Sequence, residues 1–317
     1  METISLVIPC FNEEKNVSLF YEECKKAFTN FRYSIELVFV NDGSRDNTFS
    51  ELKKLTKNND FGNVKVVNFS RNFGKEAAMY AGLEHSTGDY VAIIDADLQQ
   101  KPELIKDMIQ EIENDDTIDC VCCYQEQRIE GKLISFFKKS FYKVISKITN
   151  MDFVNGASDF RLLKRNVVEA ILSINEKNRF SKGIFSWVGF KTKYIPYIPE
   201  DRKYGTSSFN FRKLLKYAIS GILSFSVAPL HFSIYLGIIL SILSVIYLIV
   251  VIIQKLFFTI DVPGFATIVA CILLIGGQIL FVLGIIGAYI ARIYVETKAR
   301  PIYIEKEVIE SKKEVLR

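Results

Sequence analysis

The fold is decided by the stretch Tyr90-Val91-Ala92-Ile93-Ile94-Asp95-Ala96-Asp97, in which an apolar run leads directly into two aspartates. The apolar part predicts a buried strand. Carboxylates at the end of such a strand are costly unless a cation or hydrogen-bond donors compensate them. Because alternate side chains of an extended chain point the same way, Asp95 and Asp97 can face one ion. Hard oxygen ligands suit Mg²⁺ or Mn²⁺, so the stretch predicts a metal site at a strand end.

This strand belongs to a regular alternation of strands and helices over residues 3–125. Strands are predicted over Ile4–Pro9, Ile35–Val40, Val64–Phe69, Tyr90–Asp95 and Asp119–Tyr124. Helices are predicted over Glu14–Phe31, Asp46–Lys57, Lys75–His85 and Pro102–Glu113. The alternation predicts an α/β fold with a doubly wound, mainly parallel sheet covered on both faces. In such sheets ligands bind beyond the carboxyl ends of the strands.

Polar clusters follow three other predicted strands. Pro9–Glu13 ends the first strand and Asp42 follows the second, where it could accept hydrogen bonds from a ribose or a base. Arg71 and Lys75 follow the third strand and could balance the charge of a diphosphate. Two alternatives stay open: Asp42 with its following glycine could form a simple turn, and residues 70–75 could form a solvated loop.

Two long apolar stretches, residues 229–253 and 265–291, come near the end of the chain. Each exceeds the roughly 20 residues that a helix needs to cross a bilayer, and between 229 and 291 only Lys255 and Asp261 are charged. The sequence therefore predicts a cell-membrane protein with a two-helix transmembrane hairpin. The alternative is a buried helical hairpin in a soluble core.

Basic residues surround this hairpin on one side. Arg212, Lys213 and Lys216 precede it and Arg292 follows it, whereas the link carries only Lys255. The positive-inside rule places both ends in the cytoplasm, in agreement with a first strand too short for a secretory signal. We expect a cytoplasmic catalytic domain over 1–210, an amphipathic juxtamembrane segment over 211–228, the spans over 229–291, and a cytoplasmic tail over 292–317. The tail is expected to be a short exposed helix or a frayed end.

The remaining sequence gives weaker indications. Residues 132–148 predict an amphipathic helix that packs on a core or lies on the membrane surface. Small residues in the second span, among them Gly277, Gly284 and Gly287, favour a homo-oligomer. The six cysteines lack paired spacing, so reduced core thiols are expected. The net charge of +4 gives no reason to expect nucleic acid as a partner.

An ordered set of motifs now identifies a resemblance. The motifs are Val7-Ile8-Pro9-Cys10-Phe11-Asn12-Glu13, Val40-Asn41-Asp42-Gly43-Ser44, Arg71-Asn72-Phe73-Gly74-Lys75, Asp95-Ala96-Asp97-Leu98-Gln99, Ser158-Asp159-Phe160-Arg161-Leu162-Leu163, Trp187-Val188-Gly189-Phe190 and Arg202-Lys203-Tyr204-Gly205-Thr206-Ser207-Ser208. With the apolar hairpin they make nearly the whole chain similar to family 2 glycosyltransferases. The similar types are the dolichol-phosphate mannose synthases and the bactoprenol (undecaprenyl-phosphate) glucosyltransferases, which have the nucleotide-diphospho-sugar transferase fold.

The resemblance implies roles for individual residues. Donor-binding residues would be Pro9, Asn12, Glu13, Asp42, Lys75, Asp95, Gln99, Arg202 and Lys203. Asp95 and Asp97 would hold the metal and the diphosphate, and Asp159 and Arg161 would face the reacting centre. Asn41 departs from many relatives, which have an acid there, and this leaves the nucleotide preference open. The Gln-x-x-Arg-Trp element of processive polymer synthases is missing, which argues against polysaccharide export.

The expected reaction is an inverting, metal-dependent transfer of a sugar from a nucleotide-sugar to polyprenyl phosphate at the cytoplasmic membrane face. UDP-glucose is the favoured donor, and the bilayer supplies the acceptor. Since a phosphate acceptor is already ionised, Asp159 would orient the acceptor or the metal rather than act as a base. Three alternatives stay open: another lipid acceptor such as diacylglycerol or a lipid-linked saccharide, a catalytically silent nucleotide-binding scaffold, and a nucleotidyltransferase.

Overall fold

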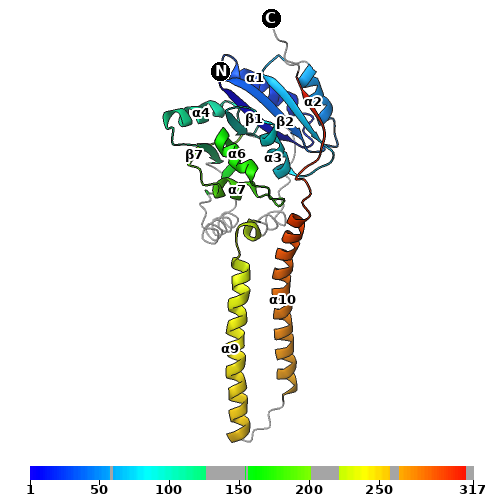
Figure 1. Cartoon of the computed structure of the whole chain (residues 1–317), viewed down its shortest axis with the longest axis vertical. Helices are drawn as coiled ribbons and strands as arrows, with labels where there is room; N and C mark the ends of the chain where they lie inside the picture. Colours follow the sequence, from blue (N-terminus) through cyan, green and yellow to red (C-terminus); the bar gives the residue numbers. More distant parts are fainter. Residues whose placement is uncertain (58–59, 126–153, 155, 201–220, 258–263, 312–317) are drawn as a thin grey trace. The chain divides into compact units, whose positions relative to one another are not determined.

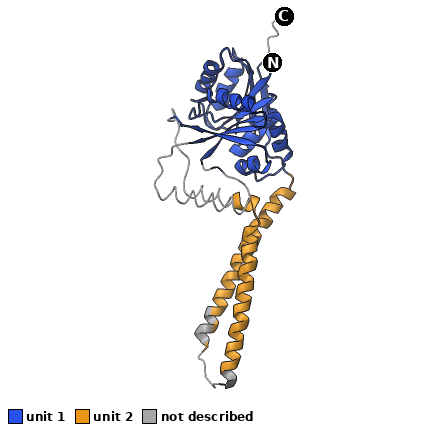
Figure 2. Cartoon of the chain, turned by 90° about the vertical axis from the view of Figure 1, so that its left-hand side faces the viewer, with its two compact units in different colours: residues 1–215, 300–317 blue, residues 216–299 orange. Residues whose placement is uncertain are grey.

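The computed structural model describes residues 1–57, 60–125, 154, 156–200, 221–257 and 264–311 (Figure 1). The chain divides into two compact units (Figure 2). Unit 1 comprises residues 1–215 and 300–317, and unit 2 comprises residues 216–299. The predicted helix over 132–148, Arg202, Lys203 and most of the predicted juxtamembrane segment lie outside the described residues.

Unit 1 contains one mainly parallel sheet with an eight-strand order of β7-β5-β6-β4-β1-β2-β3-β8 among the described residues. The strands are β1 Thr3–Cys10, β2 Ser34–Asn41, β3 Asn63–Phe69, β4 Tyr90–Ile93, β5 Cys120–Gln125, β6 Ala157–Lys164, β7 Thr192–Tyr197 and β8 Glu305–Glu310. Parallel pairing joins β4, β1, β2 and β3 in a central block, and also joins β5 to β7. Strand β6 runs antiparallel between β4 and β5. The predicted fold class is confirmed.

Helices cover both faces of this sheet, because the strands bury side chains on both sides. Among its described residues, unit 1 has the helices α1 Val17–Phe28, α2 Thr48–Lys57, α3 Lys75–His85, α4 Leu104–Asn114, α6 Arg165–Ser173 and α7 Ser181–Trp187. In β2, Leu37 and Phe39 belong to one core cluster, whereas Val38 and Val40 belong to another. Successive side chains of a strand point to opposite faces, which explains the division.

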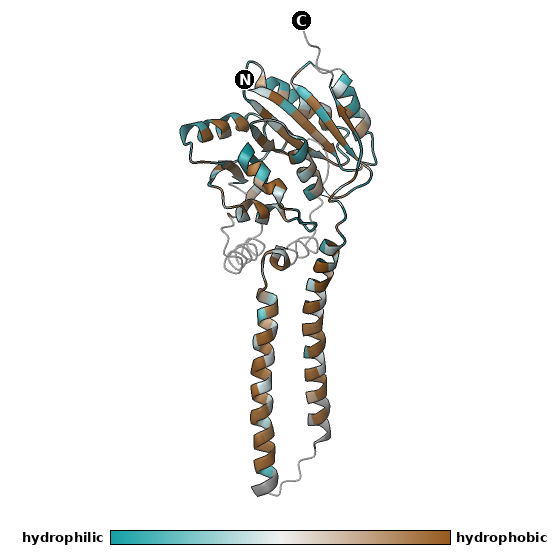
Figure 3. Cartoon of the chain, in the orientation of Figure 1, coloured by the Kyte–Doolittle hydropathy of each residue, from teal (hydrophilic) through white to brown (hydrophobic). Residues whose placement is uncertain are grey.

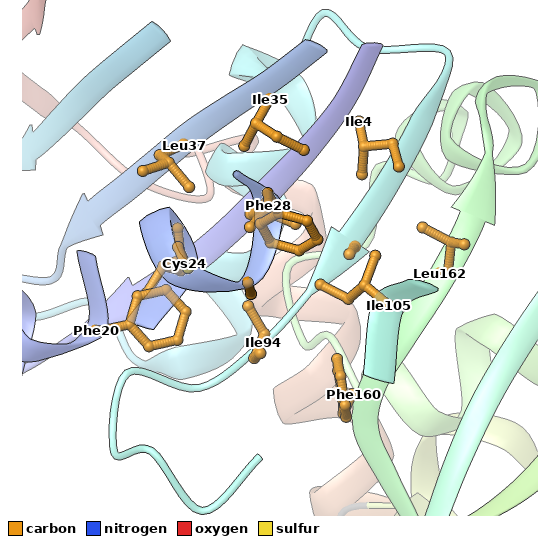
Figure 4. Packing of buried hydrophobic residues seen from close by; sticks show 14 of the residues in the cluster. Ile4, Phe20, Cys24, Phe28, Ile35, Leu37, Ile94, Ile105, Phe160 and Leu162 are labelled. Carbon is orange, nitrogen blue, oxygen red and sulfur yellow. The ribbon is translucent and has the colours of Figure 1, made fainter. Parts of the chain in front are cut away.

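The two clusters differ in size and in the helices that close them. The larger cluster lies under α1 and α4, and Figure 4 shows Phe20 and Phe28 of α1 and Ile105 of α4 among the strand residues. The smaller one packs the alanines of α3, Ala77, Ala78 and Ala81, against β2 and β3. Small side chains let α3 approach the sheet closely, which places the first residue of α3 near the strand ends.

The end of the chain forms a strand, so the expectation of an exposed helix or a frayed end is wrong for residues 305–310. Strand β8 pairs antiparallel with the edge of β3, from Lys65↔Glu310 to Phe69↔Glu305. Just before it, Ser70 N–H donates to the Ile304 carbonyl over 3.0 Å. The segment after residue 300 is therefore part of unit 1.

Unit 2 contains two long apolar helices, α9 Ala228–Phe257 and α10 Phe265–Thr297. Apolar residues predominate along both helices (Figure 3). The windows Ala228–Gln254 and Cys271–Thr297 have mean hydropathies of 3.1 and 2.4, and neither is buried by the described chain. A hairpin in a soluble core would be buried, so length, composition and exposure together indicate membrane association.

Candidate functional site

The central feature of the site is Lys75, which bridges two aspartates. Its Nζ lies 2.7 Å from Asp95 Oδ1 and 3.0 Å from Asp159 Oδ2. Asp95 follows β4, Asp159 lies in β6, and Lys75 begins α3. Because β4 and β6 are antiparallel neighbours, with Ile93 paired to Arg161, their two aspartates meet at the carboxyl edge of the parallel strands. The predicted residues Lys75, Asp95 and Asp159 thus form one cluster.

Opposite charges stabilise the ionised forms in this cluster. Burial alone lowers the pKa of Lys75, but Asp95 and Asp159 outweigh this effect and raise its pKa above the usual value. Burial raises the pKa of Asp159, but Lys75, Lys182 and Arg161 outweigh it and hold that pKa well below its usual range. At neutral pH Lys75 is therefore an ammonium in direct contact with the carboxylate of Asp159.

Arg161 is held beside this cluster by packing. Its guanidinium carbon lies 3.6 Å from the ring centroid of Phe185 in α7, and Nη2 donates to the Ser158 carbonyl over 3.0 Å. The residue is 5% exposed, and its Nε has no acceptor among the described residues. A buried donor without an acceptor is costly. The role of Arg161 at the reacting centre stays a prediction.

Asp42 anchors the loop before α3. Its carboxylate accepts hydrogen bonds from Asn72 Nδ2 at 2.9 Å, Phe73 N at 2.6 Å and Gly74 N at 3.0 Å. The next residue, Gly43, has φ +62°, and a Cβ there would lie 2.3 Å from the carbonyl carbon of Arg71. The simple-turn reading of Asp42 is thus incomplete, because the carboxylate also orders the loop that ends in Lys75. Nucleoside binding by Asp42 stays a prediction.

The loops after β1 and β2 are joined at the same edge. Asn12 has a positive φ of 59°. Its N–H donates to Ser44 Oγ over 2.9 Å, and its Oδ1 accepts from Arg45 N at 2.9 Å. Glu13 N–H donates to Thr48 Oγ1 over 2.8 Å. These bonds fix Asn12 and Glu13 beside the end of β2, and their binding roles stay predictions.

The turn after β4 orients the second aspartate. Asp97 Oδ1 accepts from Gln99 N at 3.2 Å, and Leu98 between them has a positive φ of 61°. Gln99 also exchanges hydrogen bonds with the Glu200 backbone, through N–H of Glu200 at 3.1 Å and its own Nε2 at 3.3 Å. Gln99 therefore ties this turn to the segment that leads towards Arg202 in the sequence.

A divalent cation fits the chemistry of this edge. Asp95 already accepts a cation, the ammonium of Lys75, and Asp97 adds a second carboxylate close by in the chain. The described residues contain no group of three or more His, Cys, Asp or Glu side chains that could hold a metal. Asp95 and Asp97 would hold such a cation, and substrate phosphates and water would complete its coordination.

The family follows from comparison with known proteins. The model of the family described as "Glycosyl transferase family 2" matches residues 5–172. This chain belongs to that family. It is therefore a glycosyltransferase, as the motifs predicted.

Relatives of this family 2 glycosyltransferase extend over nearly its whole length. CsbB of Bacillus subtilis, named as a glycosyltransferase, is 44% identical over 304 residues, covering 96% of this chain and 91% of the relative. A prophage bactoprenol glucosyl transferase homolog of Escherichia coli is 40% identical, covering 96% and 99%. The bactoprenol glucosyl transferase of Shigella phage SfX is 40% identical, covering 96% and 98%.

A solved structure is also similar. The glucosyl-3-phosphoglycerate synthase of Mycobacterium tuberculosis, in complex with Mn²⁺, uridine-diphosphate-glucose and phosphoglyceric acid, has a TM-score of 0.46 and 17% identity. The match covers 70% of this chain and 78% of that one.

Three features of the glycosyltransferase site go beyond the sequence prediction. They are the anchoring of the loop by Asp42, the contact of Arg161 with Phe185, and the approach of Lys182 to Asp159. Lys182 donates to the Ala157 carbonyl over 2.9 Å, which holds it beside β6. The motif after β3 indicated the loop. Its contacts with residues distant in the sequence could be found only from the register of the sheet. Pro9 lies in β1 opposite Val40, and its binding role stays a prediction.

Proposed function

We propose that this glycosyltransferase transfers glucose from UDP-glucose to a polyprenyl phosphate, with inversion and with a divalent cation. The observation that carries the proposal is the 40% identity to proteins named bactoprenol glucosyl transferase, which covers 96% of this chain. That coverage includes the apolar helices as well as the family 2 domain. An enzyme with a lipid acceptor has to act where the lipid headgroup lies, and the helices would hold it there.

The geometry supports a single displacement at the anomeric carbon. An oxygen of the acceptor phosphate would form the new bond to this carbon while the bond to the diphosphate oxygen breaks. The diphosphate leaves with the electron pair, so negative charge grows on it. Lys75, at the carboxyl edge beside Asp95, is placed to balance this charge. A cation on Asp95 and Asp97 would supply further stabilisation of the same charge.

Asp159 would position the acceptor rather than remove a proton from it. A phosphate acceptor is already an anion, so attack requires no base. The lowered pKa of Asp159 also makes it a weak proton acceptor. Arg161, with its unused buried Nε, would bind the acceptor phosphate. Arg202 and Lys203 are proposed to bind the diphosphate on sequence grounds alone.

The deciding experiment is an assay with membranes that contain the full-length protein. A panel of UDP-glucose, GDP-mannose and UDP-N-acetyl sugars would be offered with a short polyprenyl phosphate and Mn²⁺ or Mg²⁺. We expect glucose in the lipid-linked product, in β linkage if an α-linked donor reacts with inversion. Absence of lipid-linked product with every donor would refute the proposal.

The same assay separates the alternatives. Transfer to diacylglycerol but not to polyprenyl phosphate would identify a different acceptor. Release of pyrophosphate instead of nucleoside diphosphate would identify a nucleotidyltransferase. The variant Asp97→Asn should abolish transfer in an enzyme and leave a silent scaffold unaffected.

The membrane arrangement is also a proposal. Both ends of the hairpin would face the cytoplasm, with the link 254–264 on the other side. Reporter fusions after residue 225 and within the link would test this, and equal reporter signals would contradict it. Self-association through the small residues of α10 would be measured by crosslinking in the membrane.

A further inference from the structure

Tyr303, which follows the second apolar helix in the sequence, packs on β3 and α3. Its ring stacks on Phe69 with centroids 4.8 Å apart and an interplanar angle of 23°. Its hydroxyl donates to Glu84 Oε2 of α3 over 2.6 Å. Its ring also meets Tyr80 of α3 edge-on at 6.4 Å. The adjoining Ile304 carbonyl accepts a hydrogen bond from Ser70 N–H. This segment thus contacts the start of the loop after β3 and the later part of α3.

An aromatic contact continues from Tyr303 into the loop. Phe69 meets Phe73 at a centroid distance of 5.7 Å and an angle of 89°. Phe73 N–H in turn donates to Asp42 Oδ1 over 2.6 Å. Two residues later the chain reaches Lys75, which contacts Asp95 and Asp159. The stack Tyr303–Phe69–Phe73 therefore ends next to the charged cluster.

The aromatic contacts supplement the hydrogen bonds of Asp42 in holding residues 70–75. Gly74 has φ +99°, and a Cβ there would meet nothing within 4 Å. It is also the residue before α3, which has no side-chain hydrogen bond capping its first turn. A missing cap leaves the start of a helix less stable. Lys75 itself contacts Asp95 and Asp159, and the loop before it is held by Asp42 on one side and by the aromatic stack on the other.

We propose that Tyr303 is a positioning residue for the nucleotide-sugar: it holds residues 70–75 so that Lys75 meets the donor diphosphate. The proposal rests on the proposed function for the identity of the ligand. The proposal gives a role to the segment between the second apolar helix and β8. This segment follows the membrane hairpin in the chain and packs beside residues 70–75.

The kinetic test compares Tyr303→Ala with Tyr303→Phe in the full-length protein. Removing the ring should raise the KM for the sugar donor about tenfold and also lower kcat, because a misplaced Lys75 weakens both donor binding and the stabilisation of the leaving diphosphate. Tyr303→Phe keeps the stack and should restore the KM to within twofold of the wild type. A KM that is unchanged in Tyr303→Ala, or raised equally in both variants, would overturn the proposal.

Lys53→Met provides the matched control. Lys53, in α2, forms an ion pair with Glu307 in β8 at 3.2 Å. This variant perturbs the attachment of β8 without touching the stack, so its KM should stay at the wild-type value. If Lys53→Met raises the KM as much as Tyr303→Ala, the effect belongs to β8 as a whole and the proposed role of Tyr303 is wrong.

A second measurement does not depend on the reaction. The N–H groups of Phe73 and Gly74, which donate to Asp42, should exchange with deuterium about tenfold faster in Tyr303→Ala without any donor. Exchange within helix α4 serves as the reference. Unchanged exchange at Phe73 and Gly74 would overturn the positioning role. If the wild type transferred no sugar at all, the proposed function would fall, and this exchange measurement would still decide the role of Tyr303.

Discussion

Two lysines in unit 1 each contact two carboxylates. One lysine lies at the carboxyl ends of the parallel strands and the other lies near their amino ends. Lys75 contacts Asp95 and Asp159 at the carboxyl edge. Lys65, near the amino end of β3, lies 2.8 Å from Glu310 and 3.7 Å from Glu36. Their surroundings differ: the Lys65 side chain is 9% exposed and that of Lys75 is 43% exposed.

The partners of Glu36 explain what this difference means. Its carboxylate accepts hydrogen bonds from the hydroxyl of Ser5 and from Thr87 N at 2.8 Å and Oγ1 at 3.0 Å. Glu36 is 2% exposed, so its acceptors are occupied by the protein itself. Asp95 and Asp159 are 30% and 22% exposed in their side chains. A lysine between two carboxylates thus stabilises the fold at Lys65, where water is excluded. The same arrangement at Lys75 remains accessible to a ligand.

The largest expected effect is on transfer at the accessible cluster. Asp95→Asn should lower transfer by about 1,000-fold or more, because it removes charge that compensates a cation at the diphosphate. The matched change at the other edge, Glu36→Gln, should leave kcat and KM within about threefold while lowering stability. Transfer activity of both variants is measured with solubilised full-length protein. Equal losses of activity in the two variants would break the distinction between the edges.

Removal of divalent cations comes next. Excess EDTA should lower transfer about 100-fold, and added Mn²⁺ or Mg²⁺ should restore it. The midpoint of thermal unfolding should stay unchanged, because Lys75 still balances Asp95 and Asp159 without metal. Full activity in EDTA would remove the metal from the mechanism.

A pair of lysine variants separates stability from function. Lys65→Met should lower the free energy of unfolding by about 3 kcal/mol, because it leaves the buried Glu36 without its cation. Lys75→Met should cost less stability, since its partners are partly exposed, and should lower transfer instead. Denaturant unfolding and the transfer assay are run on both. The reverse pattern would show that the two clusters have been assigned the wrong way round.

The acid side of the stability profile gives a smaller effect. The pKa of Asp159 is lower in the folded state than in the unfolded chain, so its ionised form stabilises the fold. This contribution is complete above about pH 4, the unfolded value, and is lost as the pH falls through the lower folded value. The stability difference between wild type and Asp159→Asn should be constant from pH 7 to about pH 5 and shrink below about pH 4. The unfolding of both proteins would be measured over pH 3–7. A stability difference that grows in acid would contradict this expectation.

The smallest expected signal is from the thiols. Cys10, Cys24, Cys120, Cys122 and Cys123 are free and buried, as predicted for core thiols, whereas Cys271 is free but exposed, so the prediction of a core position is wrong for it. Burial raises the pKa of Cys120 to about 12, so little reactive thiolate exists at pH 8. In a Cys271→Ser background, native protein should take up almost no iodoacetamide, while denatured protein should take up five equivalents. Rapid labelling of native protein would mean that the core opens more readily than the packing implies.

The central part of the fold was predictable because its signals are local. One element is predicted by each apolar run, such as Tyr90–Ile94, and by each helical stretch. The predicted helix Lys75–His85 coincides with α3. The carboxyl ends of parallel strands then bring Asp95 into the site without any further information. Asp159 and Arg161 came from the motif alone, since the strand that carries them, β6, was not predicted.

The missed elements depend on neighbours that the sequence does not reveal. Strand β8 has four charged residues in its six, so it lacks the apolar run of a buried strand. Glu36 and Lys65 are single charged residues within β2 and β3, and nothing in the sequence indicates that they are partners. Only the register of β2, β3 and β8 brings them together in the interior. The anchoring role of Asp42 was missed for the same reason, because its donors arrive from the loop after β3.

Strand β8 can pair with β3 only late in biosynthesis. The edge of β3 is made early, but its partner leaves the ribosome 236 residues after Phe69, once both apolar helices have been made. At 5–20 residues per second this interval lasts roughly 10 to 50 seconds. During that time the nascent sheet has an open edge that could pair with another chain. Completion of the catalytic sheet therefore waits for translation of the membrane hairpin.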